Sequence, residues 1–221
     1  MDALTLIRET FAPLARRAIL DIGCGAGHLS RALSADGAAV TGIDPGEAAL
    51  AKARAAVPEA RFEAASAQAL PFPDGAFDGA VMLNSLHHVP DPAAALAEAA
   101  RVLGPGARLV VVEPLAEGTF FDALKPVEDE TDIRAAAQAA IAQAVAAGRY
   151  ACERDVVVER RETFADGEAF FTRISAVDPA RADVIRADRA TAERAFLGAA
   201  ERTAEGYALV QPLRIHVLKP E

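Results

Sequence analysis

The chain has 221 residues, of which 52% are hydrophobic and 25% are charged, and its formal net charge is -9. This length and composition predict one globular domain with a sizeable core and exclude a disordered chain. Because the charge balance is acidic, we expect no binding to nucleic acid or to an anionic membrane. The N-terminus lacks the basic start and small-residue cleavage site of a signal peptide, and no apolar run approaches the roughly 20 residues of a membrane span. We therefore expect a cytoplasmic protein.

Cysteine and histidine usage gives no sign of a metal centre. The two cysteines, Cys24 and Cys152, lie far apart in the chain and predict neither a disulfide framework nor a metal cluster. We expect Cys24 to be a small packing residue and expect no metal ion.

The first elements of the chain lead to a glycine-rich turn. Helical spacing of apolar residues predicts an amphipathic helix over the first fifteen residues, which either covers a sheet face or caps a cofactor cleft. A short apolar run over 18–22 predicts a buried strand, and a helix is predicted over 28–35. Alternating glycines between them, at positions 23, 25 and 27, let the backbone turn sharply and approach a ligand closely. The N-H groups of the helix start would then face that ligand.

The next strand adds a carboxylate to this turn. The apolar run over 38–43 ends at Asp44, which stands 21 residues after Gly23. An acid at the carboxyl end of the adjacent strand can reach ribose hydroxyls, so the pattern predicts a nucleoside-binding geometry. The dinucleotide fingerprint needs a small residue where this chain has His28. This mismatch weakens the hypothesis that the chain is an NAD-dependent dehydrogenase.

Strands and helices continue to alternate, which predicts right-handed crossovers and a doubly wound α/β sheet. The predicted helices cover 47–57 and a segment that begins after Asp91, and the predicted strands cover 61–65, 80–83 and 109–112. The segment from Asn84 to His88 follows the fourth strand, where ligands bind in open parallel sheets. It is the second expected functional region.

Beyond residue 114 the pattern changes. We expect residues 115–150 to form a lid or acceptor-binding insertion within a single domain over 1–221, because this segment is too long for a simple crossover. Its acidic run, Glu128 to Glu130, predicts a helix cap and a solvated face, with recognition of a cationic acceptor as the alternative. The remaining predicted elements are a helix over 132–147, a strand over 154–161, helices over 166–174 and 180–200, and a last strand over 208–218.

Three segments resemble the class I S-adenosylmethionine (SAM)-dependent methyltransferases, in particular the small-molecule group of the methyltransferase type 11 kind that includes quinone-pathway enzymes. They are ILDIGCGAGHLS, VTGIDPGEAALAKAR and LPFPDGAFDGAVMLNSLHHVPDPAAALAEAARVLGPGARLVVVEP, within roughly residues 1–114. The resemblance implies a Rossmann-like, mostly parallel seven-stranded sheet whose last strand runs antiparallel at the edge. It also implies methyl transfer from SAM to a small-molecule acceptor by in-line displacement, with S-adenosylhomocysteine (SAH) as product.

The resemblance assigns cofactor contacts residue by residue. Asp21, Gly23, Cys24, Gly25 and Gly27 would surround the methionine part, Asp44 and Pro45 the ribose, and Ser66, Ala67 and Gln68 the adenine, while Asn84 would end the fourth strand beside the cofactor. At position 66 the family commonly has an aspartate, so the adenine contact departs from its pattern. His87, His88 and the segment 115–150 would contact the acceptor.

The histidine pair is the candidate catalytic element. From an extended segment two neighbouring side chains point in opposite directions, so we expect one, His87 rather than His88, to face the acceptor. It would orient the acceptor or take its proton, and a loop histidine bonded to backbone is the alternative. A second hypothesis is a non-enzymatic, SAM-binding regulatory protein. In either case we expect a monomer or a homodimer. The sequence names neither the acceptor nor the methylated atom.

Overall fold

The computed structural model describes residues 2–221, and they divide into two compact units. The first unit contains residues 2–113, 136–158 and 214–221. The second contains residues 114–135 and 159–213. The additional unit thus draws on more of the chain than the insertion expected over 115–150, and the prediction of a single domain stays a prediction.

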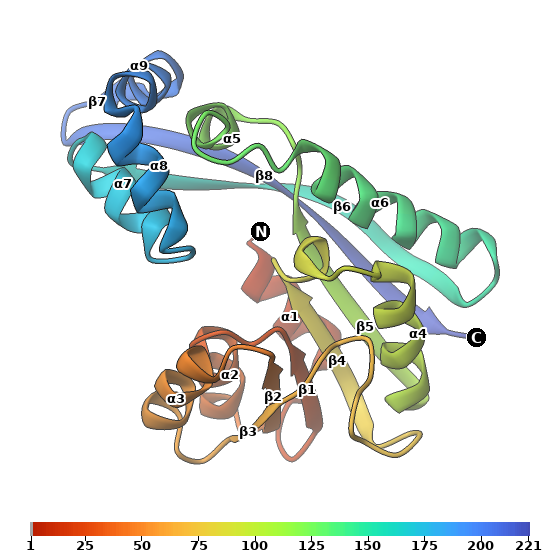
Figure 1. The fold of residues 1–221 in the computed structure, drawn as a ribbon. Helices are drawn as coiled ribbons and strands as arrows, with labels where there is room; N and C mark the ends of the chain where they lie inside the picture. Colours follow the sequence, from red (N-terminus) through yellow and green to blue (C-terminus); the bar gives the residue numbers. More distant parts are fainter. Residues whose placement is uncertain (1) are drawn as a thin grey trace. The chain divides into compact units, whose positions relative to one another are not determined.

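The first unit is built on a parallel sheet (Figure 1). Its strand order is β3-β2-β1-β4-β5-β8-β6, in which β8 is Gly206–Pro220 and β6 is Tyr150–Phe164, and β1 pairs in parallel with both β2 and β4. The parallel strands are β1 (Ala18–Ile22), β2 (Ala39–Asp44), β3 (Arg61–Ala64), β4 (Phe77–Leu83) and β5 (Leu103–Pro114). Because their carboxyl ends meet at one edge, the segments after β1, β2, β3 and β4 lie near one another. The predicted α/β fold class is confirmed.

Two long strands contribute to both units. They are β6 (Tyr150–Phe164) and β8 (Gly206–Pro220), and β8 runs opposite to β6 (Figure 1). The sequence predicted the last strand at the sheet edge, and the structure corrects its place: β8 lies between β5 and β6, so that β6 is outermost. The short strand β7 (Glu201–Thr203) pairs antiparallel with β8 and makes an eighth strand.

Side-chain alternation along the strands explains why helices cover both faces of this sheet. One face buries Leu20, Met82 and Val111 against α4 (Pro92–Val102) and the part of α6 (Thr131–Ala146) that belongs to the first unit. On the other face Phe11 of α1 (Ala3–Phe11) lies so close to Gly79 that a Cβ there would come within 2.4 Å of its ring. The first helix therefore packs against the sheet, as one of its two expected roles required.

The second unit is helical and has its own aromatic core. Its helices are α5 (Thr119–Leu124), α7 (Gly167–Ser175), α8 (Ala180–Ala187) and α9 (Arg189–Ala199). Phe170 is fully buried, stacks on Phe196 at 5.3 Å between ring centroids, and meets Phe120 edge-on at 5.4 Å. The single helix predicted over 180–200 was wrong, because Asp188 breaks it and caps α9 by accepting the N-H of Thr191.

The remaining helices of the first unit follow their sequence signals. Helix α2 (His28–Ala35) has the bounds that were predicted, and α3 (Glu47–Ala56) ends one residue before its predicted end at residue 57.

Among residues 2–221, no helix combines the length and the apolar character needed to cross a membrane.

Candidate cofactor and acceptor site

The glycine turn after β1 needs its glycines for two different reasons. Gly23, Gly25 and Gly27 all have positive φ, between +52° and +78°, where side chains with a Cβ are strained. At Gly23 a Cβ would also come within 2.4 Å of the Ser85 Cβ, whereas at Gly25 it would meet no atom of the described residues within 4 Å. Gly23 thus allows the turn to pack against the end of β4, and Gly25 borders open space.

Backbone hydrogen bonds fix this turn to the end of β2. The N-H groups of Gly23 and Cys24 both donate to the Ile43 carbonyl, at 2.8 and 2.9 Å. The Cys24 side chain is buried among α3 and β3 residues, and burial raises the pKa of its thiol, which keeps it protonated. Its side chain is the packing residue that the sequence predicted, so only its backbone can serve a ligand.

Asp21 supports the turn from a buried position. It is 2% exposed, and Ser30 of α2 donates its hydroxyl to it at 2.7 Å. Burial raises the pKa of Asp21 to about 6, the nearby Asp44 charge adds to the rise, and the hydrogen bonds from Ser30 oppose it. The carboxylate therefore ties the end of β1 to the first turn of α2.

Asp44 is brought to the glycine turn, as the sequence predicted. One carboxylate oxygen accepts the Gly25 N-H at 3.0 Å and the other accepts the Gly46 N-H at 2.8 Å. Each carboxylate oxygen can accept a further hydrogen bond, so the half-buried Asp44 can still bind hydroxyl donors. The neighbouring Pro45 is exposed.

The segment expected to flank adenine forms a tight turn beside the end of β2. Ala65 donates its N-H to the Asp44 carbonyl at 3.3 Å, and the exposed Ser66 accepts the Gln68 N-H on its hydroxyl at 3.2 Å. Ala67 packs partly against the core. The structure thus brings residues 66–68 to the same sheet edge as Asp44, and their contact with adenine stays a prediction.

Asn84 is the most unusual polar residue at this edge. It follows β4 with φ of +52°, a conformation that only a few per cent of non-glycine residues adopt. Its side-chain oxygen Oδ1 is buried and has no hydrogen-bond partner among residues 2–221. A buried acceptor without a donor costs about 1 to 3 kcal/mol, so this atom is suited to a ligand that brings a donor.

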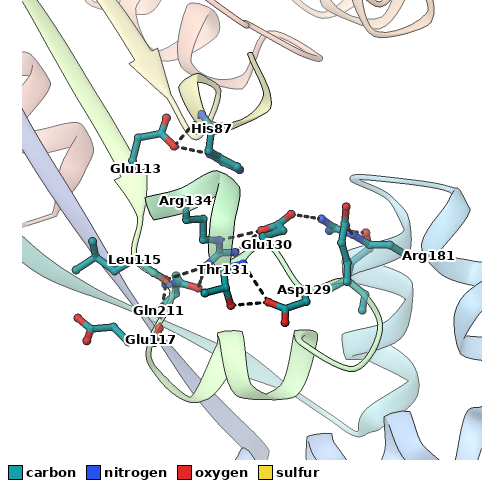
Figure 2. Close-up of polar contacts among 12 residues, drawn as sticks. His87, Glu113, Leu115, Glu117, Asp129, Glu130, Thr131, Arg134, Arg181 and Gln211 are labelled. Carbon is teal, nitrogen blue, oxygen red and sulfur yellow. Dashed lines mark hydrogen bonds and ion pairs between the residues drawn. The ribbon is translucent and has the colours of Figure 1, made fainter. Parts of the chain in front are cut away.

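The histidine pair lies in a short 3-10 turn over Leu86–His88, so the extended segment expected there was wrong. The turn buries His87, whose side chain is 3% exposed, and leaves His88 exposed. The His87 Nδ1 contacts the Glu113 carboxylate at the end of β5 (Figure 2). Glu113 was missed by the sequence analysis, although an acid after the apolar run of β5, beside the end of β4, was a usable signal.

The segment after residue 114 is held by buried charges, drawn in Figure 2. Glu130 is 2% exposed and binds Arg134 at 2.6 Å and Arg181 at 2.8 Å. Asp129 accepts the Thr131 N-H at the start of α6. The predicted helix cap is thus present, but Glu130 is buried rather than solvated, and its ion pairs with arginines explain the acidic run without a cationic acceptor.

Residues 20–111 match the family model described as "Methyltransferase domain". This stretch is a class I SAM-dependent methyltransferase domain. A ubiquinone biosynthesis O-methyltransferase from Thiobacillus denitrificans is 43% identical over 104 residues, which are 44% of each chain. A demethylmenaquinone methyltransferase from Thermus thermophilus is 46% identical over 114 residues, 48% of this chain and 52% of that one. The methyltransferase match thus spans about half the length of each relative.

One solved structure shows that the methyltransferase fold extends beyond the matched stretch. It is a putative methyltransferase from Bacillus halodurans, with a TM-score of 0.69, 19% identity and 99% of both chains covered. At this identity the likeness concerns the fold alone. The methyltransferase stretch nevertheless contains every predicted cofactor residue from Asp21 to Asn84 and both histidines.

Proposed function

We propose that this protein binds SAM at the carboxyl ends of β1, β2 and β4 and methylates a small molecule. The observation that carries the proposal is the unpaired, buried Oδ1 of Asn84, held by a left-handed backbone next to a glycine turn. A cationic or hydroxyl-bearing ligand would supply the missing donor. The family of residues 20–111 makes SAM the ligand to test first.

The residues at this edge fit the parts of SAM. The turn from Gly23 to Gly27 gives a close backbone approach, with open space at Gly25, for the methionine part. Asp44 accepts hydrogen bonds from the ribose hydroxyls, and the turn over 66–68 flanks adenine. Asn84 accepts a hydrogen bond from the amino group of the methionine part. SAM, when bound, supplies a methyl group activated by its sulfonium leaving group.

Because that methyl group is already activated, the chain's own work is positioning and, for some acceptors, proton removal. His87 is the residue with a side chain suited to hold an acceptor or to take its proton, and His88 adds a second imidazole next to it, at 4.0 Å between ring centroids. We limit the acceptor to a small molecule, because the two relatives are named for different quinone-pathway methyltransferases and each match covers only about half of the relative.

Acceptor-dependent formation of SAH tests this function. Purified protein is incubated with SAM and a set of phenolic, catecholic and quinol-type acceptors, and SAH is measured with and without each acceptor. We expect SAH to form only with some acceptors and to form more slowly in Asp44→Ala when SAM is limiting. SAM binding without SAH formation for any acceptor would favour the regulatory protein, and binding of NAD instead of SAM would favour the dehydrogenase.

A further inference from the structure

Glu113 is a buried acid to which the methyl-transfer proposal gives no role. It ends the apolar part of β5, is 1% exposed, and accepts backbone N-H groups from the turn that follows β4. Its Oε1 accepts from Ser85 at 3.0 Å and from Leu86 at 2.8 Å, and its Oε2 accepts from His87 at 3.4 Å. Three successive N-H groups aimed at one carboxylate hold the turn in place.

The fourth contact of Glu113 determines the chemistry of His87. The Nδ1 of the ring contacts Glu113 Oε2, the oxygen that also receives the His87 N-H (Figure 2). A carboxylate can only accept, so Nδ1 must carry a proton. In the neutral imidazole the other nitrogen, Nε2, is then the one with a free lone pair. The carboxylate thus selects both the orientation and the tautomer of the ring.

The same turn is joined to the cofactor side of the first unit. Ser85 donates its hydroxyl to the Ile22 carbonyl at 2.8 Å, directly before the glycine turn, and its Cβ is the atom that excludes a side chain at Gly23. Glu113 is therefore bonded to the segment that connects Asn84 with His87. One buried carboxylate thus holds the turn from Ser85 to His87 after β4.

We propose that Glu113 is a positioning residue for methyl transfer, which holds His87 as the Nδ1-H tautomer and leaves Nε2 as the base. The kinetic part of this inference rests on the proposed function. In the proton step the acceptor's O-H or N-H bond breaks, its electron pair stays on the acceptor atom, and the proton moves to Nε2. A ring with the opposite tautomer would present an N-H there and could not take the proton.

Replacing Glu113 by glutamine separates the two roles of the carboxylate. The amide oxygen of Glu113→Gln can still accept from Ser85 and Leu86, the two shorter of the three backbone contacts, so the turn is kept although the long contact from the His87 N-H is lost. Its NH2 group then faces His87 Nδ1, which must become an acceptor and pass its proton to Nε2. The variant should therefore keep the fold of the turn and invert the tautomer. Replacement of the carboxylate by its amide in a histidine-carboxylate pair is known to lower turnover strongly without loss of geometry, because the amide favours the wrong tautomer.

Nitrogen NMR of the histidine rings measures the tautomer directly. The protein labelled with 15N-histidine has four rings, and His87→Ala assigns the signal. We expect the neutral His87 ring of the wild type to be Nδ1-H and that of Glu113→Gln to be Nε2-H. Asp21→Asn, which neutralises another buried carboxylate of the same unit, should leave the His87 signal unchanged. An Nε2-H ring in the wild type, or an unchanged ring in Glu113→Gln, would overturn the inference.

Kinetics test the consequence once an acceptor is found by the SAH assay. Glu113→Gln should lower kcat by about 10²-fold or more and keep the SAM dissociation constant within about threefold. The double variant with His87→Ala should be no slower than His87→Ala alone, because both changes remove one function. Additive losses would refute a role through His87. If the wild type forms no SAH, the proposed function fails while the NMR result still decides the tautomer.

Discussion

Asp21→Asn should stabilise the protein at neutral pH, because the wild-type carboxylate is ionised in a buried place. The folded-state pKa of Asp21 is about 6, raised chiefly by burial from an ordinary value of 3.8. That difference corresponds to about 3 kcal/mol of free energy against the charged form. Asparagine has nearly the same shape, carries no charge, and its oxygen can still accept the Ser30 hydroxyl.

The sign of the pH dependence follows from proton binding. Between pH 4 and 6 the folded state holds more protons at Asp21 than the unfolded state, so the contribution of Asp21 to stability falls as pH rises. The contribution is most favourable below about pH 4 and reaches its full cost above about pH 6. The free energy of unfolding of Asp21→Asn should therefore exceed that of the wild type increasingly as pH rises from 4 to 6. The difference should reach up to about 3 kcal/mol at pH 7 and be small near pH 4.

Urea unfolding of both proteins at several pH values between 4 and 8 measures the difference in their free energies of unfolding. The contributions of all other titratable groups cancel in that difference. Ser30→Ala is the matched control: it removes the hydroxyl that opposes the rise in pKa, so its loss of stability relative to the wild type should grow with pH. A stability difference between Asp21→Asn and the wild type that does not change with pH would refute the account of Asp21 as a buried, ionisable support of the turn.

Three further substitutions test the turn, the ribose site and the second unit. Gly23→Ala should destabilise the fold by about 1 to 3 kcal/mol in urea unfolding, because its Cβ meets Ser85 and its φ is +76°; unchanged stability would contradict the described turn. Asp44→Ala should weaken SAM binding by about 10-fold or more in calorimetry, since a hydrogen bond to a charged group contributes about 1.5 to 3 kcal/mol; equal affinity would remove Asp44 from the site. Phe120→Ala should cost about 3 to 5 kcal/mol through the aromatic core, and a loss below 1 kcal/mol would argue against that packing.

The sequence predicted best where local rules and position agree. The strand over 18–22, the three glycines and the helix over 28–35 were predicted with their observed bounds, because hydrophobic runs and positive-φ requirements are properties of neighbouring residues. Asp44 was placed correctly because the carboxyl ends of adjacent parallel strands meet at one edge. Such rules need no knowledge of the distant chain.

The failures concern contacts between distant segments. Glu113 bonds to residues 26 to 28 positions away, so its place after the apolar run of β5 marks the sheet edge but does not show that it supports the histidine turn. Phe120 lies in the segment expected to form a lid, and its burial in the core of the second unit was not foreseen, because its partners Phe164 and Phe170 come from much later in the chain. The helix break at Asp188 has a local signal, because aspartate is a favourable N-cap residue. The alanine-rich residues around Asp188 favour a continuous helix and so obscure that signal.

The central claim, that the carboxyl ends of β1, β2 and β4 bind SAM, is tested most directly by calorimetric titration of the purified protein. SAM, SAH and NAD are titrated in parallel into the wild type and into Asn84→Ala, which removes the unpaired Oδ1. We predict binding of SAM and SAH, no heat with NAD, and SAM binding at least about 10-fold weaker in the folded Asn84→Ala protein. Saturable binding of NAD without binding of SAM or SAH would contradict the claim.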